Sequence, residues 1–364
     1  MLQVQSAGLN VTPLTCLRAR AKCAGICWLG DAFVKFTVVA VLSVFLLPAL
    51  AQAQGALPAP YTVPQKQWAT PEAGAPWGGS AGIERGPKGE IWAIDRCGAN
   101  SCDGSDRNPI VMLDPATGKP IKSIGAGLFV FPHGLHVDRQ GNVWVTDGAI
   151  SKDGTKGLQV LKLSPSGEVL LRLGTAGQRG DDETHFNSPS DVITGPNGDI
   201  FVTDGHAPIV PIIPAGLDMR VVKYNAKGHF IMQWGGPGVA EGKFNNPHAL
   251  AMDAKGRLYV ADRANSRIQV FTQDGNFITE WKQFGRPAGL YIAGDRLYVI
   301  DADSTEVLHP GWKKGVWIGS IAKAMPEAFV PDDQAGEGVV VAPNGNMYGA
   351  VNVDPHGITR YLKK

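Results

Sequence analysis

Two histidines in near-identical contexts are the first residues in the sequence whose spacing suggests chemistry. His133 lies in P-H-G-L and His248 in P-H-A-L. Each stands eight residues before the turn glycine of a recurring motif, and the same count back from Gly345 reaches Glu337. Two imidazoles and a carboxylate leave open positions on a metal, as in catalytic zinc and non-haem Fe(II) sites. The alternative is that each is an ordinary hydrogen-bonded residue.

Three more candidates follow the aspartates that end copies of this motif. Arg96 and Arg263 come directly after such an aspartate, and His206 comes two residues after another. Paired guanidinium groups suit a carboxylate or other oxyanion, because they donate two hydrogen bonds at once. We therefore expect Arg96 and Arg263 to bind an anionic substrate and His206 to move a proton. The alternatives are salt bridges from the arginines to the preceding aspartates and an exposed loop histidine.

A repeat of about fifty residues must position these side chains. Its copies combine a short apolar strand, a glycine turn and a second strand: GPKGEIWAID (86–95), DRQGNVWVTD (138–147), GPNGDIFVTD (195–204), DAKGRLYVAD (253–262), AGDRLYVID (293–301) and APNGNMYGAV (342–351). A second hairpin follows most copies, which makes four strands per unit. Six such units predict an all-β fold, a six-bladed β-propeller. The last unit is short, and we expect Tyr61 to Thr70 to supply its missing strand.

In a propeller the first strand of each blade lines the central channel. The eight-residue count then predicts a ring of Ala81, His133, Ser190, His248, Ala288 and Glu337. The three potential ligands come from alternate blades and converge on the channel. We expect them to bind a divalent metal; the residues alone leave zinc and Fe(II) open, and calcium is a further alternative.

Composition and the N-terminus limit the partners. Lys plus Arg number 34 and Asp plus Glu 33, a net charge of +1, which argues against a nucleic-acid binder.

Residues 36–50 are apolar and end before an A-x-A site, so residues 1–53 are expected to be an N-terminal extension and signal peptide. An uncleaved membrane anchor is the alternative. We expect residues 54–364 to form one propeller domain, exported to the periplasm or secreted, monomeric and without membrane contact. Cys97 and Cys102 are expected to form a disulfide there.

The repeat resembles the NHL-type six-bladed propellers and, more narrowly, the peptidyl-α-hydroxyglycine α-amidating lyase family. The shared strings include F-P-H-G-L-H-V-D, F-N-N-P-H-A-L-A-M-D and A-D-R-A-N-S-R-I-Q-V-F. The resemblance implies that His133 and His248 are zinc ligands and that Arg96 and Arg263 bind substrate. Three positions depart from the family. Glu337 replaces its third histidine, His206 its catalytic tyrosine, and Gly338 its calcium-associated aspartate.

The sequence therefore predicts an exported metal-dependent, lyase-like enzyme. Its expected partner is a small anionic molecule or a peptide ending in α-hydroxyglycine. Two alternatives remain at this point. One is a non-enzymatic NHL propeller that binds a peptide, glycan or protein on its loop face, and the other is a lactonase-type hydrolase.

Overall fold

The computed structural model describes residues 56–364 except 63, 71–74, 208–215 and 217. The predicted signal segment lies outside the described residues. Within the described part of the chain, no helix is long and apolar enough to cross a membrane.

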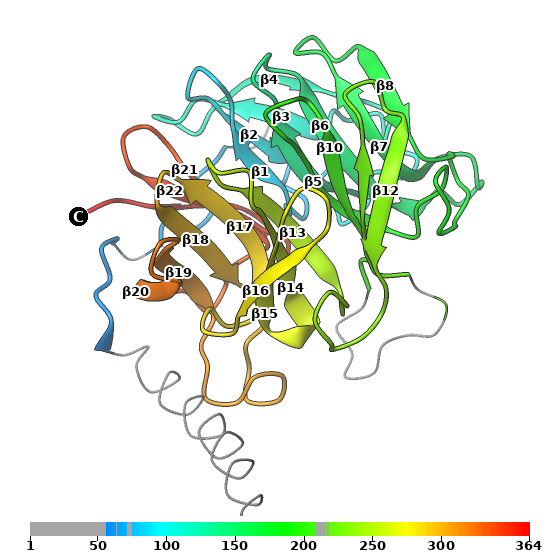
Figure 1. Cartoon of the computed structure of the whole chain (residues 1–364). Coiled ribbons are helices and arrows are strands. Elements are labelled where there is room, and N and C mark those ends of the chain that lie inside the picture. The colour runs from blue at the N-terminus through cyan, green and yellow to red at the C-terminus, as the bar shows by residue number, and fades with distance from the viewer. Residues whose placement is uncertain (1–55, 63, 71–74, 208–215, 217) are drawn as a thin grey trace, which may run out of the picture. The chain divides into compact units, whose positions relative to one another are not determined.

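The described residues form six antiparallel sheets around a central channel, which confirms the predicted six-bladed β-propeller (Figure 1). Blade 1 contains β1 (Ile83–Arg85), β2 (Ile91–Ile94), β3 (Ile110–Leu113) and β4 (Pro120–Ile124). Blade 2 contains β5 (Pro132–Val137), β6 (Val143–Ile150), β7 (Gly157–Leu163) and β8 (Val169–Leu173). Blade 3 contains β9 (Pro189–Thr194), β10 (Ile200–Asp204), β11 (Arg220–Tyr224) and β12 (Phe230–Gly235).

The remaining blades repeat this order. Blade 4 contains β13 (Pro247–Met252), β14 (Leu258–Asp262), β15 (Arg267–Phe271) and β16 (Phe277–Trp281), with a 3-10 turn η2 (Arg263–Asn265) between β14 and β15. Blade 5 contains β17 (Pro287–Ala293), β18 (Arg296–Asp301), β19 (Gly315–Ser320) and β20 (Met325–Pro331). Blade 6 has three strands, β21 (Gly338–Val341), β22 (Met347–Val351) and β23 (Gly357–Tyr361). Each innermost strand contacts the innermost strands of both neighbouring blades, so the ring closes between β21 and β1.

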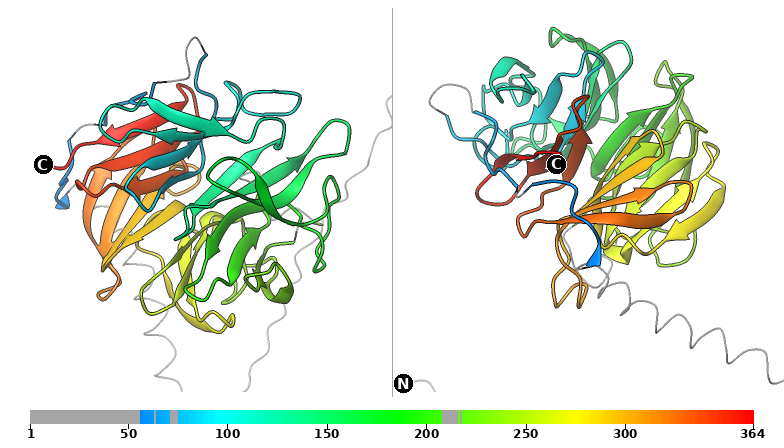
Figure 2. Two further views of the ribbon diagram at one scale, coloured as in Figure 1. Left: turned by 90° about the horizontal axis from the view of Figure 1, so that it is seen from above. Right: turned by 90° about the vertical axis from the view of Figure 1, so that its left-hand side faces the viewer.

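The N-terminal segment completes blade 6, as the sequence predicts. Tyr61 pairs with Lys363 and Gln65 with Arg360, both antiparallel. The backbone N–H of Trp68 donates to the carbonyl of Ile358 at 2.8 Å. Figure 2 shows this blue segment beside the red C-terminal strand. The pairing covers the edge of β23, which would otherwise be open to another chain.

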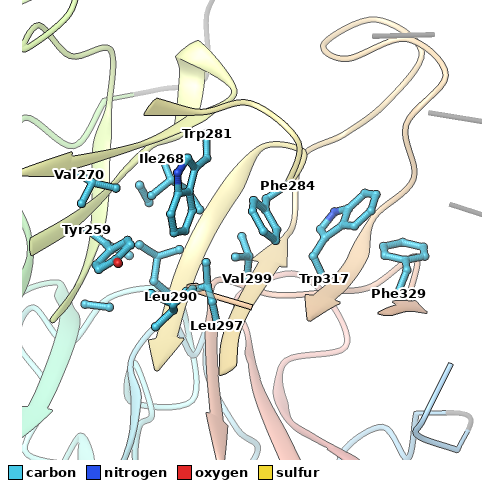
Figure 3. Packing of buried hydrophobic residues seen from close by; sticks show 14 of the residues in the cluster. Tyr259, Ile268, Val270, Trp281, Phe284, Leu290, Leu297, Val299, Trp317 and Phe329 are labelled. Atoms are coloured by element: carbon cyan, nitrogen blue, oxygen red, sulfur yellow. The ribbon is translucent and has the colours of Figure 1, made fainter. Parts of the chain in front are cut away.

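Alternating apolar residues on the strands fill the spaces between blades. The space between blades 4 and 5 holds the aromatic side chains of Tyr259, Trp281, Phe284, Trp317 and Phe329 (Figure 3). All of these are at most 5% exposed. This packing fixes each blade against the next and therefore fixes the innermost strands that carry the candidate site.

The aspartates that end the repeat copies have structural partners. Asp147 accepts hydrogen bonds from the backbone N–H groups of Val130 and Phe131, at 2.9 and 2.6 Å. Asp204 and Asp262 accept comparable bonds from the residues that lead into the innermost strands of their own blades. These carboxylates therefore hold the strand ends together.

Candidate functional site

The six predicted channel positions lie at the starts of the innermost strands. His133, Ser190, His248 and Ala288 belong to β5, β9, β13 and β17, while Glu337 directly precedes β21 and Ala81 lies just before β1. All six are at most 6% exposed. The small residues between the three larger ones leave room for the imidazole and carboxylate groups to meet.

Backbone carbonyls orient the two channel histidines in the same way. Nδ1 of His133 lies 2.8 Å from the carbonyl oxygen of Ser190, and Nδ1 of His248 lies 2.6 Å from that of Ala288. A carbonyl can only accept, so each Nδ1 carries the proton and each Nε2 presents a lone pair. Among the described residues, neither buried Nε2 has a hydrogen-bond partner. Burial lowers the pKa of His133 to about 4, which keeps its imidazole neutral.

Glu337 points its carboxylate at these two nitrogens. Its Oε2 lies 3.5 Å from Nε2 of His133, and its Oε1 lies 3.6 Å from Nε2 of His248. Ligands about 2.1 Å from a metal at tetrahedral angles are roughly 3.4 Å apart, so the spacing suits a small divalent cation. Burial opposes the charge on Glu337, but the guanidinium of Arg263 outweighs it and holds the pKa of its carboxyl well below the ordinary value.

His206 joins the same cluster from the loop after β10. Its ring centroid lies 4.5 Å from that of His133 and 5.3 Å from that of His248. Gly205 makes this entry possible, because its φ of 126° and the nearby carbonyl of Asp218 leave no place for a Cβ. One ligand atom from each of His133, His206, His248 and Glu337 lies within 4.8 Å of the others, a group that could hold a metal ion.

His206 differs from the other two histidines in how it is held. It is half-buried, and its ring nitrogens make no hydrogen bond to any described residue that would select a tautomer. Its desolvated position, beside His133 and His248, lowers its pKa well below the ordinary value. The ring is therefore neutral, and no described residue decides which of its two nitrogens carries the proton and which accepts one.

Arg263 lies against the carboxylate of Glu337. Its Nη1 donates to Oε1 of Glu337 at 2.9 Å, and its Nε donates to Asp303. Burial would lower the pKa of this guanidinium, but Glu337 and Asp303 raise it above the ordinary value. The preceding aspartate, Asp262, pairs instead with Arg267. The structure thus brings Arg263 to the cluster and ties it directly to a predicted ligand.

Arg96 enters from blade 1 and is 1% exposed. Its Nε donates to the carbonyl of Pro132 at 3.0 Å, and its Cζ lies 3.7 Å from the ring centroid of Phe131. Its buried Nη2 has no hydrogen-bond partner within the described part of the chain. Burial lowers its pKa to about 10, and the nearby Glu337 works in the opposite direction. The predicted salt-bridge alternative does not occur, because Asp95 pairs with Arg107.

Sequence reasoning missed Asp303, which holds Arg263. Asp303 stands two residues after the repeat aspartate of blade 5, the register that His206 occupies in blade 3. That shared register was a usable signal. Asn100, whose Oδ1 accepts a hydrogen bond from Nη1 of Arg96 at 2.8 Å, was also missed, since an asparagine within a loop carries no comparable pattern. The predicted disulfide between Cys97 and Cys102 is present.

Comparison with known proteins agrees with this picture. The NHL repeat family matches residues 244–271. Peptidyl-glycine alpha-amidating monooxygenase A of Xenopus laevis is 41% identical over 204 residues, covering 53% of this chain and 20% of that protein. Peptidyl-alpha-hydroxyglycine alpha-amidating lyase 1 of Drosophila melanogaster is 30% identical over 281 residues, covering 70% of this chain and 49% of that protein. The chain therefore spans a fifth to a half of these relatives.

A solved structure supports the fold alone. A gluconolactonase from Xanthomonas campestris superposes with a TM-score of 0.55 at 16% identity, covering 80% of this chain and 87% of that one. Together with the sheet order, the repeat match and the relatives, this leads to one conclusion. The chain is a six-bladed β-propeller that carries an NHL repeat and is homologous to the peptidyl-α-hydroxyglycine α-amidating lyases.

Proposed function

We propose that the protein is a metal-dependent lyase that splits N-acyl-α-hydroxyglycine groups into an amide and glyoxylate. The observation that carries the proposal is the convergence of acceptor atoms in the channel. The Nε2 lone pairs of His133 and His248 and the carboxylate of Glu337 face one another with no donor hydrogen between them. A divalent cation between these acceptor atoms would bind both imidazole lone pairs and the carboxylate oxygen at once.

His133, His248 and Glu337 would hold the metal. All three are buried, and the carbonyls of Ser190 and Ala288 fix the two imidazoles in the ligating tautomer. The ion would supply Lewis-acid polarisation of a substrate oxygen. Two imidazoles and a carboxylate suit either zinc or Fe(II), and we propose zinc as the first metal to test.

His206 would act as the general base. It is the least buried histidine of the cluster, and no described residue fixes its tautomer, so it can take a proton from an entering substrate. It would remove the proton from the α-hydroxyl group. The oxygen electron pair then forms the aldehyde carbonyl, the carbon–nitrogen bond breaks, and the departing amide nitrogen receives the proton back from His206. The atoms of the substrate are thus divided between the amide and glyoxylate.

Arg96 would bind the substrate carboxylate. Its Nη2 is a buried donor without a described partner, and an unpaired buried donor costs about 1–3 kcal/mol. A carboxylate in the channel would satisfy it. Arg263 would serve the same anion less directly, because two of its donors already engage Glu337 and Asp303.

The test is turnover of N-benzoyl-α-hydroxyglycine by the zinc-loaded protein, with glyoxylate and benzamide as the measured products. His206→Ala should keep its zinc and lose roughly 10²- to 10⁴-fold in rate. His248→Ala should lose the zinc itself. Tightly bound zinc without turnover would leave a ligand-binding propeller, and hydrolysis of a lactone with calcium would favour the lactonase alternative.

The expected export also enters as a proposal. The Cys97–Cys102 disulfide supports it, because such bonds persist in oxidising compartments. We propose that the chain acts there as a monomer, with residues 54–364 as its propeller domain. Light scattering of the secreted protein and sequencing of its N-terminus would test both points.

A further inference from the structure

The guanidinium of Arg96 is fixed on three sides. Nε donates to the carbonyl of Pro132, Nη1 donates to Oδ1 of Asn100, and the ring of Phe131 lies against its face. The buried Nη2, by contrast, has no hydrogen-bond partner among the described residues. The side chain can therefore turn only if one of these three contacts breaks.

Asn100 sits in a loop that is closed on itself. The disulfide joins Cys97 to Cys102 and brackets the asparagine. The backbone N–H of Cys102 donates to the carbonyl of Val130 at 2.8 Å, and that of Gly98 donates to Oδ1 of Asp95 at 2.9 Å. The loop is thus attached both to its own strand end and to the segment that leads into β5.

Gly79 lies against both Asn100 and the guanidinium of Arg96. A Cβ at this position would lie 2.7 Å from Oδ1 of Asn100 and 3.5 Å from Nη1 of Arg96. The absence of a side chain here lets the asparagine reach the arginine. The backbone N–H of Gly79 also donates to the carbonyl of Ala99 at 2.7 Å, which holds the loop next to it.

We propose that Asn100, carried by the disulfide-closed loop, is a positioning residue for Arg96. It occupies Nη1 and thereby leaves Nη2 as the donor available to an anion in the channel. The loss of this contact would free the guanidinium to rotate. This inference rests on the proposed function only for the identity of the anion, a substrate carboxylate; the positioning itself is independent of it.

The first test measures the mobility of the Arg96 side chain by NMR. In protein labelled with 15N-arginine, the Nε–H resonance that disappears in Arg96→Lys identifies the side chain. We expect this resonance to be sharp and slow to exchange in the native protein. It should broaden or exchange at least about tenfold faster in Asn100→Ala and in the double variant Cys97→Ser/Cys102→Ser. Asn100→Asp keeps the acceptor and should restore the native signal.

A matched control lies between β2 and β3, outside the disulfide-closed loop. Asn108→Ala removes an asparagine whose Oδ1 accepts from the backbone N–H of Ala126, away from the arginine. This variant should leave the Arg96 resonance unchanged. A native Arg96 resonance in Asn100→Ala would overturn the proposal, as would equal effects of the two alanine variants. Melting curves identify any variant that fails to fold. If Asn100→Ala does not fold, the Arg96 resonance of Asn100→Asp is compared with the native one instead, and a broadened resonance there would contradict the proposal.

A second readout separates this inference from the proposed reaction. N-benzoylglycine, which has the carboxylate but lacks the hydroxyl group, serves as the binding probe. Its Kd should rise roughly tenfold in Asn100→Ala, and the KM for N-benzoyl-α-hydroxyglycine should rise with it at a nearly constant kcat. If the native protein turns over no hydroxyglycine, the proposed function fails while the resonance experiment still decides the positioning role. A fall in kcat at unchanged KM would contradict the carboxylate-binding role.

Discussion

Arg263 donates a hydrogen bond from Nη1 to Oε1 of Glu337 at 2.9 Å and so links blade 4 to blade 6 beside the channel histidines. The two residues are 74 positions apart in the chain. The arginine neutralises the buried carboxylate, yet Oε2 remains directed at His133. The carboxylate can therefore carry a negative charge in the apo protein and still offer an oxygen to a metal.

Replacing Glu337 tests its place in the ligand set. Glu337→Gln removes the charge but keeps the shape, and we expect zinc affinity to fall by about 10- to 100-fold. Glu337→His should retain stoichiometric zinc, because imidazole is an equally good ligand. Competition with a chromophoric chelator measures both affinities.

The control for these variants lies at a separate position in the channel wall. Glu84→Gln, on β1 near His136, should bind zinc as the native protein does. Equal zinc affinity of Glu337→Gln and the native protein would remove Glu337 from the ligand set.

Removing Arg263 should destabilise the protein, because it leaves the buried carboxylate of Glu337 without its partner. Arg263→Ala leaves Glu337 and Asp303 without their guanidinium, and breaking a buried pair costs about 3–5 kcal/mol. We expect the apo variant to melt well below the native protein. Zinc should restore more of its melting temperature than it adds to the native protein, because the ion neutralises the same carboxylate. Parallel melting curves with zinc and with chelator provide the comparison.

A matched arginine makes the result specific. Arg267 pairs with Asp262 in the same blade, outside the cluster. Arg267→Ala should lower the melting temperature to a similar extent without any extra rescue by zinc. Identical zinc responses in the two variants would show that Arg263 does not act on the metal site.

The repeat made much of this site predictable, and the reason is geometric. Residues eight positions before the turn glycines share one register, so the convergence of His133, His248 and Glu337 follows from six equivalent blades. The shared register with His206 could have placed Asp303 near the site, but its pairing with Arg263 and the contact of Arg96 with Asn100 were not predictable. Both depend on how loops from neighbouring segments meet, and loop conformation follows local contacts rather than the repeat.

His309 gives the folded protein a specific dependence on pH. Its ring stacks on Trp312 with centroids 4.6 Å apart, and burial lowers its pKa to about 4. Above about pH 6.5 both the folded and the unfolded chain hold it neutral. Between about 6.5 and 4 only the unfolded chain binds the proton, so this residue makes the free energy of unfolding fall as the pH drops.

Urea unfolding at pH 7.5 and pH 5 measures this contribution. Between pH 7.5 and pH 5 the free energy of unfolding should fall less in His309→Gln than in the native protein. The exposed His229→Gln should show no such shift relative to the native protein. A difference between native and His309→Gln protein that is the same at both pH values would refute the assignment.

Removing the N-terminal segment should open the ring at blade 6. A chain that lacks residues 56–70 loses the backbone pairing of Tyr61 and Gln65 with the C-terminal segment. It also loses the contact between Trp68 and Tyr348, whose ring centroids lie 4.6 Å apart. We expect a lower melting temperature and, because β23 becomes an open edge, self-association visible in light scattering. Tyr61→Phe removes the hydroxyl group, which donates to the carbonyl of Gly345, but keeps the backbone pairing; it should remain monomeric with nearly native stability. A truncated chain that stays monomeric and melts at the native temperature would mean that three strands suffice to complete blade 6.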